Sequence, residues 1–329
     1  MSSGSRGRQT GMSTQTHPLA PADRDAFAAL AERHRHELQL HCYRMIASFD
    51  EAQDLVQETF LRAWRKKDTF AGRSSFRAWL YGIATNACLD AIARRARTLA
   101  AAPGFEVTWL EPYPEAELDA VPGPADTVIA KETVELAYLV AIQHMTPQSR
   151  AVLILRDVVG LPAKETAELL ETSVPAVNSA LQRARTVLAE QLPSERAEWT
   201  PGGEAATEEK ALLERYMRAT EEADVDALKA TLAEEVRFAM PPEPERYTGR
   251  HTVVGYWVQG GFGTEELGQM RCVPTRVNRQ SAVGCYLPRG GAWRPFSLDV
   301  LRIAGGEIAE IVTFPLDDPA RYGLPEVLA

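Results

Sequence analysis

The chain has 329 residues, 45% of them apolar and 25% charged, which suits two or three globular domains and excludes a disordered or fibrous protein. A net charge of −9 excludes a histone-like protein held on DNA by charge alone, although the first hundred residues carry 15 Lys and Arg against 10 Asp and Glu. We find no secretory signal and no uncharged apolar stretch of about 18 residues, which predicts a cytoplasmic protein with no membrane contact.

The first predicted domain spans residues 20–99 and follows a stretch rich in Ser, Gly, Thr and Arg, residues 1–19, that we expect to be a disordered tail. Apolar residues recur at the spacing of one helix face between Ala52 and Ala63, while the opposite face is polar. Ser75 marks the start of another helix, whose last turns carry arginines at the favourable end of the helix dipole. This domain is therefore expected to be all helical.

Two aromatic residues of this domain allow two interpretations. Trp79 and Tyr81 lie off the apolar stripe of their helix and beside Arg77, an arrangement that suits stacking on the bases of single-stranded nucleic acid. An aromatic residue at such a position is also often packed in the core, and the sequence leaves the choice open.

Residues 100–126 are crowded with Pro, Gly, Glu and Asp, which predicts an extended acidic linker. A second helical domain is predicted for residues 127–192. In it, Thr146 can cap a helix, Pro147 fits the first turn of that helix, and Gly160 can end it.

The strongest local motif of the second domain is PAKETAELLETSVPAVNSALQRARTVL, which predicts a helix-turn-helix. Ser173 can cap the second helix, whose outer face carries amide and guanidinium groups suited to base edges and phosphates. Glu171 stands where such turns usually have glycine, and a left-handed residue there costs about 1 kcal/mol. The alternative is an ordinary helical hairpin with a solvated polar face.

The third predicted domain, residues 207–329, follows a linker at residues 193–206 and has the pattern of an α+β fold. We expect two helices, a strand in VRFAM, a helix in HTVVGYWVQGGF and then four strands. Gly305 and Gly306 predict a two-residue hairpin turn between the last two strands.

Metal, disulfide and cofactor chemistry are not indicated by the sequence. The run HRHELQLHC contains His34, His36 and His41 but lacks a four-ligand spacing, so we expect no metal site and no cofactor. The cysteines lack a CxxC spacing and are expected to be reduced: Cys42, Cys88, Cys272 and Cys285.

Several motifs together carry a family resemblance. The chain contains, in order, DLVQETFLRAW, FRAWLYGIATNACLDAIARR, a linker with WLEPYP, and TPQSRAVLILRDVVGLPAKETAELLETSVPAVNSALQRAR. Over residues 20–192 it closely resembles bacterial RNA polymerase sigma factors of the extracytoplasmic-function group. The third domain resembles the SnoaL-like fold, a cone of curved sheet and helices around a pocket, and a subgroup of these sigma factors carries this fusion.

The resemblance implies a multidomain fold: an all-α domain of the sigma region-two type, an all-α helix-turn-helix domain of the region-four type, and an α+β SnoaL-like cone domain. It also implies a factor that binds core RNA polymerase through the β′ clamp helices and the β flap. Such a factor directs polymerase to promoter DNA and catalyses no reaction itself.

Candidate contacts follow from the same resemblance. Core polymerase would meet Asp54, Gln57, Glu58, Arg62 and Arg65. The minus-ten element would meet Trp79, Tyr81, Asn86, Asp90, Arg94 and Arg95. The minus-thirty-five element would meet Ser173, Pro175, Asn178, Ser179, Gln182, Arg183 and Arg185. A C-terminal pocket would be bordered by His251, Tyr256, Trp257, Trp293 and Asp299.

The resemblance further implies that the acidic linker threads toward the active-site and RNA-exit channels of polymerase, whereas a solvated spacer would have the same composition. The linker carboxylates concerned are Glu111, Glu115, Glu117 and Asp119. The third domain would restrain the factor in place of a separate partner and respond to a small ligand, and the alternative is that its aromatic residues only fill the cone. Two other functions stay open: a SnoaL-like enzyme with Asp299 or His251 as acid or base, and a helix-turn-helix regulator that acts without core polymerase.

Overall fold

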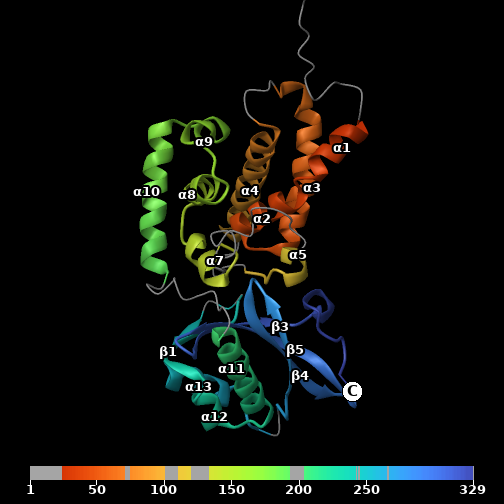
Figure 1. Ribbon diagram of the computed structural model, residues 1–329, viewed down its shortest axis with the longest axis vertical. Coiled ribbons are helices and arrows are strands. Elements are labelled where there is room, and N and C mark those ends of the chain that lie inside the picture. Colours follow the sequence, from red (N-terminus) through yellow and green to blue (C-terminus); the bar gives the residue numbers. More distant parts are fainter. Residues whose placement is uncertain are drawn as a thin grey trace, which may run out of the picture.

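The computed structural model describes residues 24–70, 75–100, 110–119, 133–192, 204–241, 243, 245–264 and 267–328. A helical half lies above a half built on a β-sheet (Figure 1). The predicted tail at residues 1–19 lies outside the described residues, as do most residues of the two predicted linkers. The domain boundaries therefore stay predictions.

The first helical domain consists of α1 (Arg24–Glu32), α2 (Arg35–Ile46), α3 (Phe49–Lys66), the short turn η1 (Lys67–Thr69) and α4 (Phe76–Ala100). Ser48 caps α3 by accepting a hydrogen bond from the backbone N–H of Glu51, and the Ser75 hydroxyl accepts from the N–H of Ala78. The apolar face predicted for α3 is buried, which confirms the helical period read from the sequence.

The second helical domain consists of α7 (Leu136–Gln143), α8 (Pro147–Leu153), the π-helical turn η3 (Ile154–Val158), α9 (Ala163–Leu169) and α10 (Val174–Gln191). Thr146 caps α8, Pro147 lies in the first turn, and Gly160 follows η3 with φ +80°, so all three predicted signals are confirmed. A short helix, α5 (Glu115–Asp119), lies in the linker between the two helical domains, so the extended conformation predicted for this segment is wrong for these residues.

The C-terminal domain begins with α11 (Glu204–Glu221) and α12 (Val225–Lys229). The strands are β1 (Leu232–Ala239), β2 (Arg246–Thr248), β3 (Arg271–Val277), β4 (Gln280–Arg289), β5 (Ala292–Ala304) and β6 (Glu307–Pro315), with α13 (Arg250–Gln259) after β2 and the turn η5 (Pro319–Tyr322) after β6. They form one sheet in the order β2-β1-β6-β5-β4-β3, in which only β1 and β6 pair in parallel. The α+β fold is confirmed, and β2 is an additional strand that the sequence pattern did not reveal.

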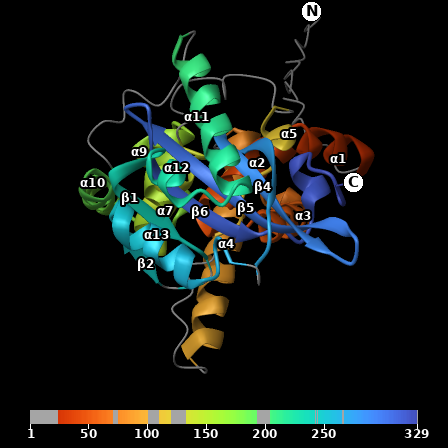
Figure 2. The ribbon, with the colours of Figure 1, turned by 90° about the horizontal axis from the view of Figure 1, so that it is seen from below.

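The two faces of this sheet pack against different partners. Along β5, Leu298 and Val300 join a core that is continuous with the helical domains, whereas Leu301 joins a separate core with α11, α12 and α13. Seen from below, α11, α12 and α13 lie on the side of the sheet away from the helical domains (Figure 2). The alternation of side chains along each strand therefore divides the C-terminal domain into a docking face and an inner face.

The two helical domains are packed closely against each other. Gly82 of α4 lets α9 approach, because a Cβ atom at this position would lie 2.6 Å from Cδ2 of Leu169. Buried Arg150 of α8 donates hydrogen bonds to the carbonyl oxygens of Met45 and, at 3.0 Å, Ile142. Burial lowers the pKa of the Arg150 guanidinium to about 10. The first and second domains are thus tied by a buried charge that the sequence analysis did not identify.

Candidate functional site

The segment from α9 to α10 has the backbone of a helix-turn-helix. Glu171 adopts φ +50° in the turn, as predicted from its place at a position where such turns usually have glycine. Ser173 caps α10 by accepting a hydrogen bond from the N–H of Ala176, and Pro175 lies in the first turn, where a missing N–H costs nothing. These local interactions set where α10 begins and how it leaves the turn.

The outer face of α10 is available for contact. Val177 and Ala184 are buried against α8 and α9, while the predicted contact residues of the helix are exposed: Asn178, Ser179, Gln182, Arg183 and Arg185. Arg185 differs from the others because its guanidinium donates two hydrogen bonds, of 2.8 and 2.7 Å, to the carboxylate of Asp157. These bonds hold Arg185 against η3, so the exposed polar face is centred on the first half of the helix.

The two aromatic candidates of α4 are packed in the first domain. Tyr81 is buried, and its hydroxyl donates to Glu37 at 3.2 Å, so its assignment as an exposed stacking residue is wrong. Trp79 is half-buried and packs on the rings of Phe70 and Phe76, with ring centres 5.1 and 5.7 Å apart. The long α4 buries more of its circumference than its apolar stripe indicates, because α2, α3, α8 and α9 all contact it.

The polar candidates of α4 lie on its exposed side and partly pair with α3. Asn86, Asp90 and Arg94 are exposed. Asp90 accepts a hydrogen bond from Arg62 of α3 at 2.7 Å, and Arg95 forms an ion pair with Glu51. The face predicted for DNA and the face predicted for polymerase therefore meet at the Asp90–Arg62 pair.

The exposed face of α3 contains a residue that the sequence analysis missed. Asp54, Gln57 and Arg65 are exposed, whereas Glu58 pairs with Arg62 at 2.8 Å. Leu61 lies four residues after Gln57 on the same face and is 53% exposed. The sequence could have revealed Leu61, because it is an apolar residue at a polar position of an amphipathic helix. It adds an apolar centre to the face of α3 that is predicted to bind core polymerase.

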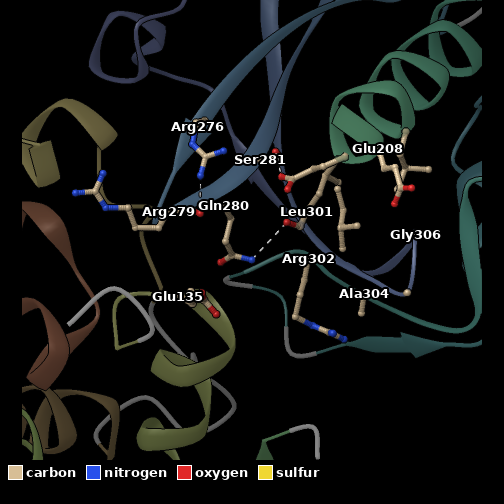
Figure 3. Close-up of a pocket in the computed structure, with 14 residues that line it drawn as sticks. Glu135, Glu208, Arg276, Arg279, Gln280, Ser281, Leu301, Arg302, Ala304 and Gly306 are labelled. Atoms are coloured by element: carbon tan, nitrogen blue, oxygen red, sulfur yellow. Dashed lines mark hydrogen bonds between the residues drawn. The ribbon is translucent and has the colours of Figure 1, made fainter. Parts of the chain in front are cut away.

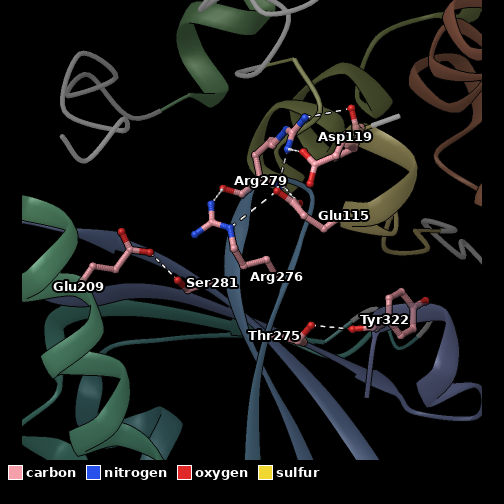
Figure 4. Close-up of polar contacts among 9 residues, drawn as sticks. Glu115, Asp119, Glu209, Thr275, Arg276, Arg279, Ser281 and Tyr322 are labelled. Carbon is pink, nitrogen blue, oxygen red and sulfur yellow. Dashed lines mark hydrogen bonds and ion pairs between the residues drawn. The ribbon is translucent and has the colours of Figure 1, made fainter. Parts of the chain in front are cut away.

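The acidic linker is held in place at both ends of its described segment. The carboxylate of Glu111 accepts hydrogen bonds from the Ser48 hydroxyl at 2.9 Å and the backbone N–H of Asp50 at 3.3 Å, at the start of α3. Glu115 and Asp119 both form ion pairs with Arg279 of the C-terminal domain (Figure 4). The reading of these three carboxylates as a solvated spacer is wrong for this arrangement, and Glu117 is half-buried beside them.

The β3–β4 turn is the element that reaches the linker. Asn278 and Arg279 occupy its two central positions with φ +54° and +61°, which a two-residue hairpin needs. The Asn278 side chain is fully buried: its Oδ1 accepts from the N–H of Tyr113 at 2.7 Å, and its Nδ2 donates to the Tyr43 hydroxyl at 2.9 Å and to the Val134 carbonyl. One side-chain amide thus binds α2, the linker and the residues just before α7.

Next to this turn, a cavity of about 260 Å³ lies between the helical and C-terminal domains (Figure 3). Gln280 spans it: its Oε1 accepts from the N–H of Leu136 at 2.9 Å, and its Nε2 donates to the Leu301 carbonyl at 3.4 Å. Arginine and glutamate side chains also line it, among them Arg276, Arg302 and Glu208. The junction between the domains is therefore polar and incompletely filled.

The predicted C-terminal pocket exists with a partly different lining. Tyr256, Trp257 and Asp299 line a cavity of about 430 Å³ on the inner face of the sheet. His251 is exposed at the start of α13, and Trp293 lies under the guanidinium of Arg271, 4.8 Å from ring centre to cation, so both assignments to this pocket are wrong. Trp293 is the second residue of β5, where its backbone pairs with that of Leu328.

Other expectations concern metals, thiols and membranes. All four cysteines are free, which agrees with the prediction. Among the described residues, no group of three or more His, Cys, Asp and Glu side chains is arranged to hold a metal ion. Within the same residues, no helix combines the length and the apolar character needed to cross a membrane.

Comparison with known proteins identifies two family regions and a relative that matches most of the chain. The Sigma-70 region 2 family model matches residues 30–98, and the Sigma-70, region 4 family model matches residues 135–188. The chain is 39% identical to the ECF RNA polymerase sigma factor SigG of Mycobacterium tuberculosis (strain H37Rv), over 94% of this chain and 87% of SigG. It is 32% identical to the ECF RNA polymerase sigma factor SigW of Bacillus subtilis, over 52% of this chain and 90% of SigW.

A solved structure shares the fold of nearly the whole chain. The crystal structure of the extracytoplasmic function sigma factor SigJ of Mycobacterium tuberculosis superposes with a TM-score of 0.58 at 22% sequence identity. The match covers 91% of this chain and 99% of the SigJ chain. The order of two helical regions followed by a sheet domain is therefore a known architecture.

Proposed function

The chain belongs to the extracytoplasmic-function (ECF) RNA polymerase sigma factors, and we propose that its C-terminal domain holds this sigma factor in a restrained, closed form. Its function is that of the family: it acts with core RNA polymerase to start transcription at particular promoters. The restraint is our proposal, and no step of it involves catalysis.

The observation that carries this proposal is the capture of the interdomain linker by the β3–β4 turn. Buried Asn278 binds the linker backbone at Tyr113, and half-buried Arg279 binds the linker carboxylates of Glu115 and Asp119. This linker joins the two helical domains, so fixing its centre limits how far α4 and α10 can separate. A factor that reads two promoter elements needs that separation to match their spacing.

A second contact supports the same restraint. Arg321, in the turn η5 of the C-terminal domain, pairs with Asp50 at the start of α3 at 2.9 Å, and its guanidinium lies 5.4 Å from the ring centre of Phe49. Because the contacts are within one chain, each re-forms at a high effective concentration after it breaks. Core polymerase must therefore bind the open form more tightly than the closed form in order to release it.

The closed form leaves the predicted contact faces uncovered. Asp54, Gln57 and Leu61 of α3 and Asn178 and Arg183 of α10 are exposed. We propose that the α3 face docks on the β′ clamp helices, that the exposed side of α4 meets the minus-ten element, and that α10 reads the minus-thirty-five element while its domain meets the β flap. The C-terminal domain would then restrain the sigma factor by fixing the relative positions of these faces, and not by covering them.

The test is a charge reversal in the turn. Arg279→Glu places a carboxylate against Glu115 and Asp119 and repels the linker, so we expect about tenfold tighter binding to core polymerase and more transcription from a target promoter in vitro. Arg289→Glu, at the exposed far end of β4, is the matched control with the same change in net charge. Both variants are checked for an unchanged helical signal by circular dichroism.

The outcomes separate the restraint from the family function. Equal core affinity of the Arg279→Glu variant and the wild type would contradict the restraint and leave the sigma factor assignment unaffected. Failure of the wild type and both variants to bind core polymerase at all would contradict the assignment itself.

A further inference from the structure

Two cysteines of the C-terminal sheet lie directly opposite each other on neighbouring strands. Cys272 of β3 and Cys285 of β4 are partners in the antiparallel register, and both pack with the core on the inner face of the sheet. Cys285 is 1% exposed, whereas Cys272 is half-buried and is the one cysteine of the four that is not buried. The function proposed above uses neither thiol.

The backbone places this pair at a narrow position of the ladder. Opposite residues of an antiparallel ladder alternate between hydrogen-bonded pairs and narrower pairs without mutual hydrogen bonds, whose Cα atoms are about 4.5 Å apart. The N–H of Cys272 donates outside the ladder, to the Glu221 carboxylate of α11 at 2.8 Å. Pro274, two residues further along β3, has no N–H and fits the same kind of position. Because disulfides join Cα atoms about 4.4 to 6.8 Å apart, this pair can be bridged without separating the strands.

The two thiols have different surroundings, which give them different roles. Half-buried Cys272 is within reach of a small oxidant, and its thiolate is the attacking group. A hydrogen bond with Cys272, burial and the charge of Asp299 raise the pKa of the Cys285 thiol well above its usual range. The Cys285 Sγ also donates a hydrogen bond to the Asp299 carboxylate at 3.6 Å. Cys285 therefore keeps its proton until Cys272 has reacted, and Asp299 is in place to receive that proton.

We propose that Cys272 and Cys285 form a peroxide-sensitive pair that closes into a cross-strand disulfide and thereby fastens the hairpin that holds the linker. The Cys272 thiolate attacks one oxygen of hydrogen peroxide: an S–O bond forms, the O–O bond breaks, and the leaving hydroxide takes up the proton that Cys272 released, which gives water and a sulfenic acid. The Cys285 sulfur then attacks the Cys272 sulfur: the S–S bond forms, the S–O bond breaks, and the leaving hydroxide receives the Cys285 proton by way of Asp299 and becomes water. The two sulfurs together lose two electrons, which reduce the peroxide.

A second pair of cysteines has the same chemistry but is shielded from solvent. Cys42 of α2 and Cys88 of α4 hydrogen-bond to each other, yet each is 0% exposed in the core of the first domain. An oxidant in solution reaches these thiols only after the helices open. The chain thus contains its own reference for a reaction that depends on access.

The disulfide would fasten the element that grips the linker. The segment between the two cysteines contains the β3–β4 turn, whose Arg279 pairs with the linker carboxylates of Glu115 and Asp119 (Figure 4). β3 is the last strand of the sheet, and a covalent bond at the end remote from the turn keeps it on β4 when the linker is pulled away. The hairpin then loses the disordered states in which it could release the linker. The expected effect on polymerase binding rests on the restraint proposed above, whereas formation of the bond does not.

The first measurement locates the bond. The full-length protein is treated with hydrogen peroxide, the remaining thiols are blocked in denaturant, and a tryptic digest is analysed by mass spectrometry without reduction. Trypsin cuts after the arginines on either side of each cysteine, so the disulfide would link residues 272–276 to residues 280–289. We expect this linked peptide as the main product, with Cys42 and Cys88 still free. Cys272→Ser, which removes the attacking thiol, should leave Cys285 free.

The second measurement tests the effect on binding to core polymerase. After the peroxide is removed, the oxidised wild type should bind core polymerase about threefold more weakly than the reduced wild type, and dithiothreitol should restore the affinity. Cys272→Ser is the matched control, and peroxide should not change its affinity. Oxidation should also have no effect on Arg279→Glu, because this variant no longer holds the linker.

The outcomes separate the disulfide from the restraint. The proposal is overturned if peroxide leaves Cys272 and Cys285 free, or if Cys42 and Cys88 become linked before them. Equal core affinity of the oxidised and reduced wild type, when Arg279→Glu binds more tightly than both, would overturn the fastening of the hairpin and leave the restraint standing. If Arg279→Glu binds as the reduced wild type does, the restraint fails, and the linked peptide would still establish the disulfide.

Discussion

Asn278 Nδ2 donates a hydrogen bond to the Tyr43 hydroxyl at 2.9 Å, and this hydroxyl in turn donates to the backbone carbonyl of Glu111 at 2.8 Å. The tip of a hairpin in the C-terminal domain is thereby joined to the second helix of the first domain and to the linker in one continuous chain of hydrogen bonds. All three residues are distant in sequence, so the closed arrangement depends on them meeting in the folded protein.

We expect Asn278→Ala to lower the free energy of unfolding by about 3 kcal/mol, because the N–H of Tyr113 and the carbonyl of Val134 lose a buried partner. Urea unfolding followed by circular dichroism measures this difference. Asn86→Ala, at an exposed position of α4, is the matched control and should change the free energy by less than about 0.5 kcal/mol. Similar losses of unfolding free energy in both variants would show that the hydrogen bonds of Asn278 do not stabilise the fold.

We expect Asn178→Ala and Arg183→Ala each to weaken transcription that depends on the minus-thirty-five element. If the side chain makes a good base contact, the loss should correspond to about 1 to 3 kcal/mol. Thr186→Ala, farther along the exposed side of α10, serves as the control. In vitro transcription from promoters with intact and mutated elements makes the comparison. Unchanged promoter selectivity in both variants would mean that this face is only solvated.

We expect Glu171→Gly to raise the free energy of unfolding by about 0.5 to 1 kcal/mol. Glu171 has φ +50°, where a side chain is disfavoured, and glycine relieves that cost although it also loosens the unfolded chain. The same substitution at Glu168, inside α9, should be destabilising by about 1 kcal/mol. Equal effects at both positions in chemical denaturation would contradict a strained turn.

We expect stability to fall by about 2 kcal/mol between pH 7 and pH 5 because of His41. This residue is fully buried, and burial together with the nearby charges of Arg44 and Arg77 lowers its pKa from 6.5 to about 3. Between these two pKa values the unfolded chain binds a proton that the folded chain does not, so acid favours unfolding. The stabilising contribution is complete above pH 6.5 and is lost as the pH falls toward 3.

The variant His41→Gln keeps a polar group near Thr85 and should flatten this pH dependence, whereas His144→Gln, at an exposed site, should not. The measurement is the free energy of unfolding at several pH values. An unaltered slope in the His41→Gln protein would rule out His41 as the cause.

Local pattern was sufficient for several helix caps and tight turns, although it missed the short helix α5 (Glu115–Asp119) in the segment predicted to be extended. Ser173 and Thr146 cap the helices that the sequence predicted, Glu171 takes the left-handed conformation, and Gly305 and Gly306 form the hairpin turn. These features depend on residues within one turn of each other, so their energetics are contained in a short segment. The exposed face of α10 follows from the same periodicity.

Tertiary structure decided which polar and aromatic groups are buried and what they contact. Tyr81 is buried because four helices surround α4, and the carboxylates of Glu115 and Asp119 pair with an arginine about 160 residues later in the chain. Asp299 was visible in the sequence only as an isolated carboxylate, and its three donors come from α11, β4 and β6. Such contacts join segments with no periodic relation to each other, and because desolvation depends on everything that surrounds a side chain, no local pattern specifies them.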